Sequence, residues 1–145
     1  MRYSIPRLVI AATQSGSGKT TIAMGLLSAL REQGLVVQSF KVGPDYIDPM
    51  FHSRIIGAKS SNLDAFFFDP DTLRYLLARN ARGCDVTVIE GVMGYYDGLG
   101  LTSTRASTYE VARETQSPVV LVVNARGAAL SVLAAVEGFL HFAPD

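Results

Sequence analysis

Four short runs of mainly apolar residues, rich in β-branched side chains, are spread along the chain. They cover residues 8–12, 35–42, 86–89 and 119–123. Their apolar positions are continuous rather than alternating, which is typical of strands buried on both faces of a parallel sheet. Parallel neighbours need long crossover connections, usually helices. The pattern therefore predicts a parallel sheet whose strands are separated by helices.

Between these runs, apolar residues recur at helical spacing. The expected helices cover residues 19–33, 70–80, 107–115 and 128–142. Gly34 would end the first as a left-handed C-cap, and Asp69 would cap the second ahead of Pro70. Strands that alternate with helices indicate an α/β fold of three layers with a mostly parallel sheet.

Composition narrows the class of protein. Of the 145 residues, 48% are hydrophobic and 18% charged, which fits one globular domain. Thirteen basic residues balance thirteen acidic ones, so no overall field favours nucleic acid or an anionic membrane. No apolar run approaches the roughly 20 residues of a membrane span. With no secretory signal and a single cysteine, Cys84, we expect a cytoplasmic protein with no nucleic-acid or membrane partner.

Residues 13–20, TQSGSGKT, lie between the first expected strand and the first expected helix and nearly match the Walker A phosphate loop. The consensus has glycine where this chain has Thr13. Lys19 would reach the β- and γ-phosphates of ATP, and Thr20 would offer its hydroxyl to Mg²⁺. The alternative is a loop that only caps a helix. The predicted cofactor-binding residues are Ser15, Gly16, Ser17, Gly18, Lys19, Thr20 and Thr21.

A second metal ligand is expected where the strand at 86–89 ends, at Glu90. Ligands of open α/β sheets bind outside the carboxyl ends of the strands, and the phosphate loop lies at that same edge. Glu90 is therefore predicted to hold Mg²⁺, directly or through water. The alternative is a glutamate that bonds local backbone.

Residues 41–49, KVGPDYIDP, concentrate one cation, two carboxylates and an aromatic ring after the second expected strand. Lys41 would neutralise a phosphoryl group in transfer. Asp45 and Asp48 would complete a metal shell or bind substrate. For Asp48 the alternative is a helix cap ahead of Pro49.

Residues 91–98, GVMGYYDG, place adjacent tyrosines and a carboxylate at the same sheet edge. Flat aromatic surfaces beside Asp97 suit a large planar substrate with polar arms. Tyr95 and Tyr96 could equally cover the core with their hydroxyls in water.

These motifs together resemble the cobyrinate a,c-diamide synthases, a family of phosphate-loop amidoligases related to dethiobiotin synthetase. The resemblance covers nearly the whole chain, and the segment 41–49 is its most specific part. Three positions depart from the family pattern: Ala12 replaces Gly, Tyr95 replaces Leu and Asn124 replaces Asp. The motifs that carry it are TQSGSGKTT at 13–21, FKVGPDYIDP at 40–49 with FH at 51–52, NLD at 62–64, EGVMG at 90–94 with YDG at 96–98, and PVVLVV at 118–123 with ARG at 125–127.

The resemblance implies that ATP phosphorylates the a- and c-carboxylates of a corrin ring precursor, and that ammonia from glutamine displaces each phosphate. It implies a metal held by Thr20 and Glu90, to which the segment 41–49 adds Asp48 as a third predicted ligand. The implied catalytic residues are Lys19, Lys41, Asp45, Asp48 and Glu90, and the implied substrate-binding residues are Asp45, Tyr46, Tyr96 and Asp97.

Enzymes of this family are much longer and carry a C-terminal glutamine amidotransferase domain with its own Cys and His. Residues 1–145 are therefore interpreted as a partial N-terminal ATP-binding synthetase domain, incomplete at its C-terminus and without glutaminase activity. A missing strand would expose a sheet edge or an apolar helix face, which would favour a homo-oligomer.

The sequence also leaves other interpretations open. Amidation of a different tetrapyrrole, such as nickel-sirohydrochlorin, would use the same activation site, whereas cobyric acid synthase fits the segment 41–49 less well. A nucleotide-dependent switch of the partitioning-ATPase type usually has a lysine five residues before the Walker lysine, where this chain has Gln14. The bland alternative is a fragment with no activity of its own.

Overall fold

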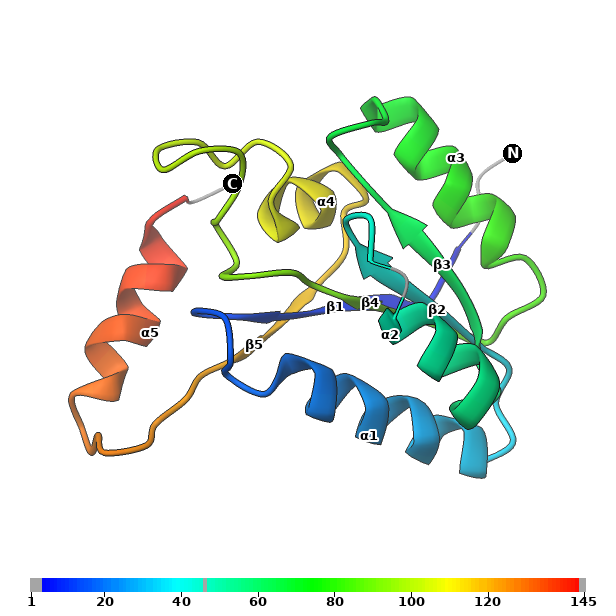
Figure 1. The fold of residues 1–145 in the computed structure, drawn as a ribbon, viewed down its shortest axis with the longest axis horizontal. Helices are drawn as coiled ribbons and strands as arrows, with labels where there is room; N and C mark the ends of the chain where they lie inside the picture. Colours follow the sequence, from blue (N-terminus) through cyan, green and yellow to red (C-terminus); the bar gives the residue numbers. More distant parts are fainter. Residues whose placement is uncertain (1–3, 46, 144–145) are drawn as a thin grey trace.

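A parallel sheet of five strands lies at the centre of the computed structural model, which describes residues 4–45 and 47–143. The strand order is β3-β2-β4-β1-β5, and every neighbouring pair is parallel, which confirms the predicted α/β class (Figure 1). The strands are β1 (Arg7–Ala12), β2 (Val37–Val42), β3 (Lys59–Leu63), β4 (Val86–Glu90) and β5 (Val119–Val122).

Helices cover both faces of this sheet. Helix α1 and the π-helical turn η1 pack against one face, while α3 and α4 lie on the other (Figure 1). None of the helices within residues 4–45 and 47–143 is long and apolar enough to cross a membrane. The helical elements are α1 (Lys19–Glu32), α2 (Ile47–Phe51), η1 (His52–Ile56), α3 (Pro70–Asn80), α4 (Thr108–Glu114) and α5 (Val132–His141).

Successive residues of the central strands point to opposite faces, and both faces are covered. In β1, Val9 belongs to the core under α3 with Leu73, whereas Ile10 belongs to the core over α1 with Leu27. All four side chains are at most 1% exposed. Burying a side chain of this size stabilises the fold by about 1.5–3 kcal/mol relative to leaving it exposed to water. Burial on both sides explains why these strands are apolar at consecutive positions.

The predicted helix ends are confirmed by their caps. The Asp69 side chain accepts a hydrogen bond from Thr72 N–H at 2.8 Å, and Pro70 is the first residue of α3. Gly34 follows α1 with φ of 84°, in the left-handed region.

Two elements were missed by the sequence pattern. Strand β3 carries the polar residues 59–62 and only one fully buried side chain, Leu63, because it lies at the edge of the sheet. Its backbone hydrogen bonds with β2 hold it in the sheet, and the pattern of its side chains does not predict them. The second missed element is the helical segment 47–56, formed by α2 and η1.

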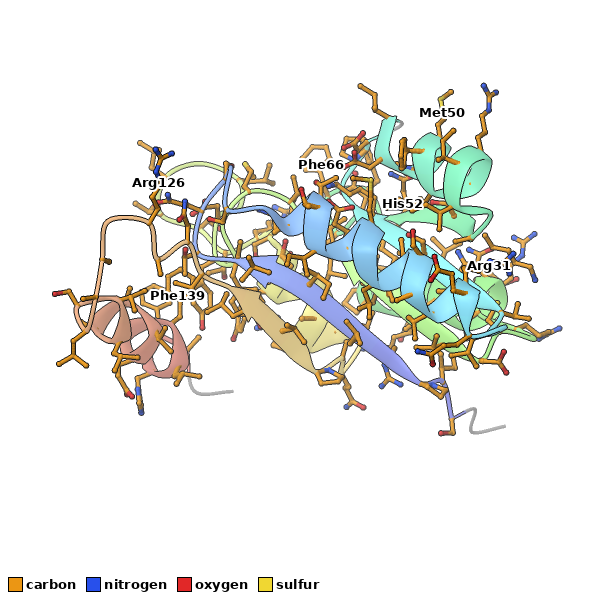
Figure 2. The ribbon with its side chains drawn as sticks, turned by 90° about the horizontal axis from the view of Figure 1, so that it is seen from below. Arg31, Met50, His52, Phe66, Arg126 and Phe139 are labelled. Carbon is orange, nitrogen blue, oxygen red and sulfur yellow. The ribbon has the colours of Figure 1, made fainter. Side chains whose placement is uncertain are left out.

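Helix α5 is shorter than predicted and lies away from the sheet layers (Figures 1 and 2). None of its described residues is buried, and Leu133 and Leu140 are more than half exposed. It contacts the rest of the fold at Tyr96, whose ring stacks on Phe139 with a centroid distance of 5.5 Å. Strand β5 lies at an edge of the sheet, and Val120 on it is 49% exposed.

Candidate active site

The phosphate-loop segment connects the end of β1 to the start of α1. Gly18 occupies the N-cap with φ of 94°, which glycine adopts without strain. No side chain caps this helix end, and the first helical hydrogen bond runs from Ile22 N–H to the Gly18 carbonyl at 3.0 Å. The N–H groups of Lys19, Thr20 and Thr21 therefore have no acceptor within the helix. Together with the helix dipole, they suit phosphate oxygens.

The other predicted cofactor-binding residues form the turn just before α1. Ser15 and Gly16 are exposed, and the Ser17 hydroxyl donates to the Gln14 carbonyl at 3.0 Å. All seven residues thus lie in one continuous segment at the carboxyl end of β1.

The Lys19 ammonium is held by backbone carbonyls and not by a carboxylate. Its Nζ donates to the Met93 carbonyl at 2.5 Å and lies 3.5 Å from the Gln14 carbonyl. Burial lowers the pKa of Lys19, the positive charge of Lys41 lowers it further, and Glu90 and Asp97 oppose the shift. An incoming phosphate would supply the negative charge that this ammonium lacks.

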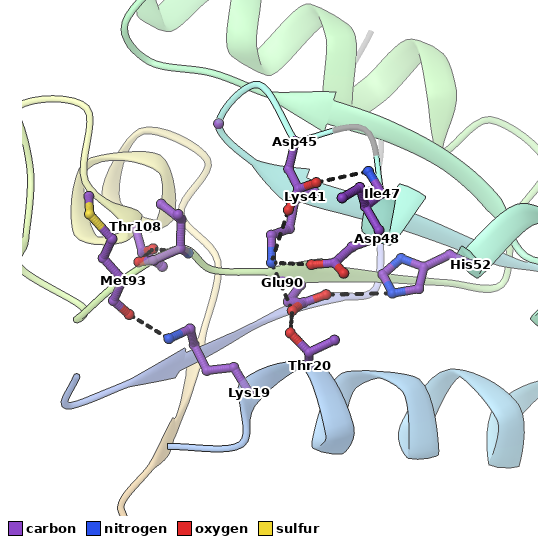
Figure 3. Close-up of polar contacts among 12 residues, drawn as sticks. Lys19, Thr20, Lys41, Asp45, Ile47, Asp48, His52, Glu90, Met93 and Thr108 are labelled. Atoms are coloured by element: carbon purple, nitrogen blue, oxygen red, sulfur yellow. Dashed lines mark hydrogen bonds and ion pairs between the residues drawn. The ribbon is translucent and has the colours of Figure 1, made fainter. Parts of the chain in front are cut away.

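The register of the sheet brings two predicted catalytic residues together. Lys41 on β2 and Glu90 on β4 are directly paired, and side chains opposite each other on adjacent strands share a face. The Lys41 Nζ lies 2.8 Å from Glu90 Oε1. The Thr20 hydroxyl donates to that same oxygen at 2.5 Å, so Glu90 joins the phosphate loop to Lys41 (Figure 3).

Lys41 is the centre of a buried ion-pair cluster. Its ammonium contacts Asp48 Oδ2 at 2.7 Å and Glu90 Oε1 at 2.8 Å, with Asp45 Oδ2 further away at 4.0 Å. The Lys41 side chain is 6% exposed and that of Glu90 1%. Burial by itself would lower the pKa of Lys41, but hydrogen bonds and charges from Asp48 and Glu90 outweigh it and raise this pKa. Lys41 is therefore held as an ammonium.

His52 also belongs to this cluster, although the sequence analysis assigned it no role of its own. Its Nδ1 lies 2.8 Å from the Ser39 hydroxyl and its Nε2 lies 3.5 Å from Glu90 Oε2. Burial lowers the pKa of His52 more than the nearby carboxylates of Glu90 and Asp48 raise it, which favours the neutral ring. The signal available in the sequence was its position four residues after Asp48, which places both on one helix face.

Asn62 near the end of β3 belongs to the motif at 62–64 that carries the resemblance, but no role for it could be predicted from the sequence. Its side-chain amide donates to the carbonyls of Gly43 and Asp45, both at 2.7 Å. The Asp45 carboxylate in turn accepts from the N–H of Ile47 at 2.9 Å. These contacts shape the loop that leads into α2. Tyr46, a predicted substrate-binding residue, lies outside the described residues.

We expect Asn62→Ala to loosen the loop at 43–45 without unfolding the sheet. Two backbone carbonyls lose their donor, which costs about 1–3 kcal/mol if they stay dry and less if water replaces the amide. Urea denaturation measures this cost, and hydrogen exchange of Ile47 N–H reports loosening of the turn. Ser61→Ala, one position earlier on the same strand, is the control. Unchanged exchange at Ile47 would contradict a positioning role for Asn62.

Tyr96 and Asp97 are not brought into the Lys41 cluster. The Asp97 carboxylate accepts from Gly94 N–H at 2.8 Å, and the Tyr96 hydroxyl donates to the Phe139 carbonyl of α5 at 2.8 Å. A Cβ at Gly94 would lie 2.5 Å from Asp97 Oδ2 and 2.9 Å from the Thr13 carbonyl, so this turn requires glycine. Burial raises the pKa of Tyr95 to about 12, so its hydroxyl stays protonated.

Tyr96 and Asp97 instead line a pocket close to Lys19. The pocket has a volume of about 510 Å³ and includes Met93, whose carbonyl holds the Lys19 ammonium. Pockets of this size hold small-molecule ligands in other proteins. Tyr96, Asp97 and Phe142 form part of its wall.

The residues around Glu90 fit a magnesium ion that arrives with a nucleotide. Within residues 4–45 and 47–143 no three His, Cys, Asp or Glu side chains form a metal cage. Mg²⁺ needs no such cage, because it is commonly held by one or two carboxylates together with phosphates and water. Thr20 and Glu90 supply adjacent hard oxygen atoms. Asp48, the third predicted ligand, contacts this pair through the Lys41 ammonium.

An uncapped glycine-rich loop on a parallel sheet, with a lysine and a hydroxyl at its end and a strand-end carboxylate beside them, defines a phosphate-loop nucleotide-binding domain. Comparison with known families agrees. The chain belongs to the family described as the CobQ/CobB/MinD/ParA nucleotide binding domain, whose model matches residues 8–133.

Curated relatives confirm the resemblance found in the sequence. The chain is 51% identical over 142 residues to a hydrogenobyrinate a,c-diamide synthase from Streptomyces coelicolor. It is 47% identical over 140 residues to a cobyrinate a,c-diamide synthase from Listeria monocytogenes, and 45% identical over 141 residues to one from Thermoplasma acidophilum. These matches cover 96–98% of this chain but only 29–32% of the relatives, so the chain spans about three-tenths of their length.

Proposed function

We propose that residues 1–145 form the ATP-binding part of a cobyrinate a,c-diamide synthase in cobalamin biosynthesis, which activates the a- and c-carboxylates of the corrinoid as acyl phosphates. The observation that carries this proposal is the position of Glu90. Its Oε1 contacts Thr20 of the phosphate loop and Lys41 of the segment 41–49. The nucleotide side and the carboxylate-rich side of the site therefore meet at one buried side chain.

The reaction needs activation because a carboxylate is a poor acyl donor. A carboxylate oxygen of the substrate would attack the γ-phosphorus of ATP, the bond to the β,γ-bridging oxygen would break, and ADP would leave. Ammonia would then attack the acyl carbon, and the bond from that carbon to the phosphate oxygen would break. The products are the amide and inorganic phosphate, with one proton released by the attacking ammonia.

The side chains of this chain suit the first half of that sequence. Lys19 would bind the β- and γ-phosphates through an ammonium that has no carboxylate partner of its own. Lys41, held charged by its neighbours, would offset negative charge on the phosphoryl group in transfer. Thr20 and Glu90 would hold Mg²⁺, which neutralises phosphate charge when bound.

Asp45 and Asp48 belong to the segment that we assign to the substrate. Their carboxylates are placed by different means. Asp48 is paired with Lys41 at 2.7 Å, and the Asp45 carboxylate caps the start of α2 through Ile47 N–H. Tyr96 and Asp97 would contact the substrate from the pocket beyond Lys19.

Glutamine hydrolysis is assigned to a domain outside residues 1–145. The single cysteine of the chain, Cys84, lies in the loop just before β4, with its sulfur 4.0 Å from the carbonyl of Asn80, the last residue of α3. That position is at the opposite end of β4 from Glu90. We expect no glutaminase activity from this chain.

Titration calorimetry of Mg·ATP with the purified chain tests the proposal. We expect saturable binding that tightens at least about 5-fold when cobyrinate or hydrogenobyrinate is present, a coupling typical of two ligands that share a site. The matched ligand control is the a,c-diamide product, in which the two target carboxylates are already amides and should give no tightening.

Three results would count against the proposal. Tightening by nickel-sirohydrochlorin alone would assign the same chemistry to another tetrapyrrole. Binding of ATP with no effect of any tetrapyrrole would favour a nucleotide switch. No ATP binding by a folded chain would mean that these residues do not form a nucleotide site without the rest of the protein.

A further inference from the structure

Two buried polar atoms face each other across the Lys41 cluster without a hydrogen bond in the described part of the chain. They are His52 Nε2 and Glu90 Oε2, and they lie 3.5 Å apart. His52 is 0% exposed and Glu90 1%. Burying such atoms without partners costs free energy, so a pair of them in contact calls for a chemical explanation.

The chemistry of the neighbours decides which ring nitrogen carries the hydrogen. An ionised carboxylate only accepts hydrogen bonds, so an attractive contact with Glu90 requires a hydrogen on His52 Nε2. In the neutral ring Nδ1 then has a lone pair, and the Ser39 hydroxyl at 2.8 Å can donate to it. We therefore assign the chain of contacts as Ser39 hydroxyl to His52 Nδ1, and His52 Nε2–H to Glu90 Oε2.

We propose that His52 is a positioning residue whose Nε2–H holds Oε2 of Glu90, so that Oε1 stays turned toward Thr20 and Lys41. This inference rests on the proposed function, because it concerns how Glu90 is presented to Mg²⁺ and nucleotide. The two oxygens of Glu90 then have separate partners: Oε1 accepts from Thr20 and Lys41, and Oε2 faces His52 (Figure 3).

The local fold supports this division. Asp48 in α2 and His52 at the start of η1 are four residues apart in one continuous helical segment. One helix face thus presents the Asp48 carboxylate to Lys41 and the His52 imidazole to Glu90. It therefore contacts both members of the central ion pair. The switch to π-helical geometry begins at His52, and such turns are frequent at functional sites.

The 3.5 Å separation is slightly longer than a relaxed hydrogen bond. Contacts of this kind at reactive sites often tighten only when the ligand is bound. Groups that orient a metal ligand from behind typically change metal affinity by about 10–100-fold when they are removed. Removing His52 is therefore expected to weaken Mg²⁺ binding, an effect that a purely structural role would not produce.

Nuclear magnetic resonance of the nitrogen-15-labelled chain tests the hydrogen bond directly. The chain has two histidines, and His141 is exposed, so it serves as an internal reference. At neutral pH we expect His52 in the Nε2–H tautomer, with slow solvent exchange of that hydrogen. The Nδ1–H tautomer would overturn the proposal, because an Nε2 lone pair cannot hold a carboxylate.

The functional test compares three variants by the Mg²⁺ concentration that half-saturates ATP binding. We expect His52→Leu to raise that concentration about 10-fold, with ATP affinity in excess chelator unchanged. His52→Gln has an amide that can reach the same oxygen and should restore most of the loss. His141→Gln is the matched control and should behave as the parent chain.

The outcomes separate this proposal from the proposed function. If His52→Leu and His52→Gln both lower thermal stability but leave the Mg²⁺ midpoint unchanged, His52 is only a structural residue and the proposal fails. If the parent chain binds no Mg·ATP at all, the proposed function fails, and the metal-positioning role of His52 fails with it whatever the tautomer.

Discussion

Replacing Lys19 with methionine should remove most of the affinity for Mg·ATP while leaving the fold intact. The Lys19 ammonium donates to two backbone carbonyls and has no carboxylate partner, so its removal costs the protein about 1–3 kcal/mol if these carbonyls stay dry and less if water replaces the ammonium. In the nucleotide complex the same group would make charged hydrogen bonds to phosphate, each worth about 1.5–3 kcal/mol. We expect a loss of at least about 100-fold in affinity, or about 2.7 kcal/mol.

Calorimetry with Mg·ATP measures this loss, and urea denaturation checks the fold. The chain has three lysines, and the third, Lys59, is exposed at the start of β3. Lys59→Met is therefore a matched control, which removes the same charge and should change neither measurement. Equal losses of affinity in both variants would show that Lys19 acts only through net charge, which would contradict a specific phosphate contact.

Replacing Lys41 with methionine should, unlike the Lys19 change, cause a large loss of folding stability. Glu90 and Asp48 would then lie close together in the interior, and neither would retain its cation. Removing one partner of a buried ion pair typically costs about 3–5 kcal/mol. We expect the free energy of unfolding to fall by that amount, as measured by urea denaturation at neutral pH.

A double variant separates the ion pair from simple loss of packing. Lys41→Met combined with Glu90→Gln removes both the ammonium and the buried carboxylate charge, so it should be more stable than the sum of the single changes predicts. We expect a coupling of at least about 1 kcal/mol, within the range for residues in contact. Strict additivity would mean that the Lys41–Glu90 contact contributes little to the fold.

Lys19 and Lys41 lie in the same site but differ in their contacts with carboxylates. Burial lowers the pKa of Lys19, and no carboxylate is in contact with its ammonium to reverse that shift. Contacts with Asp48 and Glu90 raise the pKa of Lys41. The first ammonium has no carboxylate partner of its own, and the second is already paired with Asp48 and Glu90. Both lysines are predicted from the sequence to be catalytic, but the pairing of β2 with β4, which sets Lys41 beside Glu90, is a tertiary feature.

Much of the fold follows from local signals in the chain. Continuous apolar runs predicted β1, β2, β4 and β5, because a strand covered on both faces must be apolar at consecutive positions. Caps such as Asp69 and Gly34 marked helix ends because they act within a few residues of themselves. The phosphate loop and the carboxylate at the end of β4 could be located for the same reason.

Other elements depend on neighbours that are distant in sequence. Strand β3 is polar and is held by its pairing with β2, so no pattern of its own predicted it. Asn62 acts through its reach to the carbonyls of Gly43 and Asp45, which local sequence does not reveal. Helix α5 has an apolar pattern, yet it lies off the sheet against Tyr96.

By itself, then, the sequence determined the α/β class, the phosphate loop, the polar segment at 41–49 and the strand-end position of Glu90. Only the tertiary structure decided how these parts meet. The pairing of β2 with β4 sets Lys41 beside Glu90, and the helical segment 47–56 brings Asp48 and His52 onto that pair. The reason is physical: helical and strand periodicity are local properties, whereas strand register and burial arise from contacts between segments far apart along the chain.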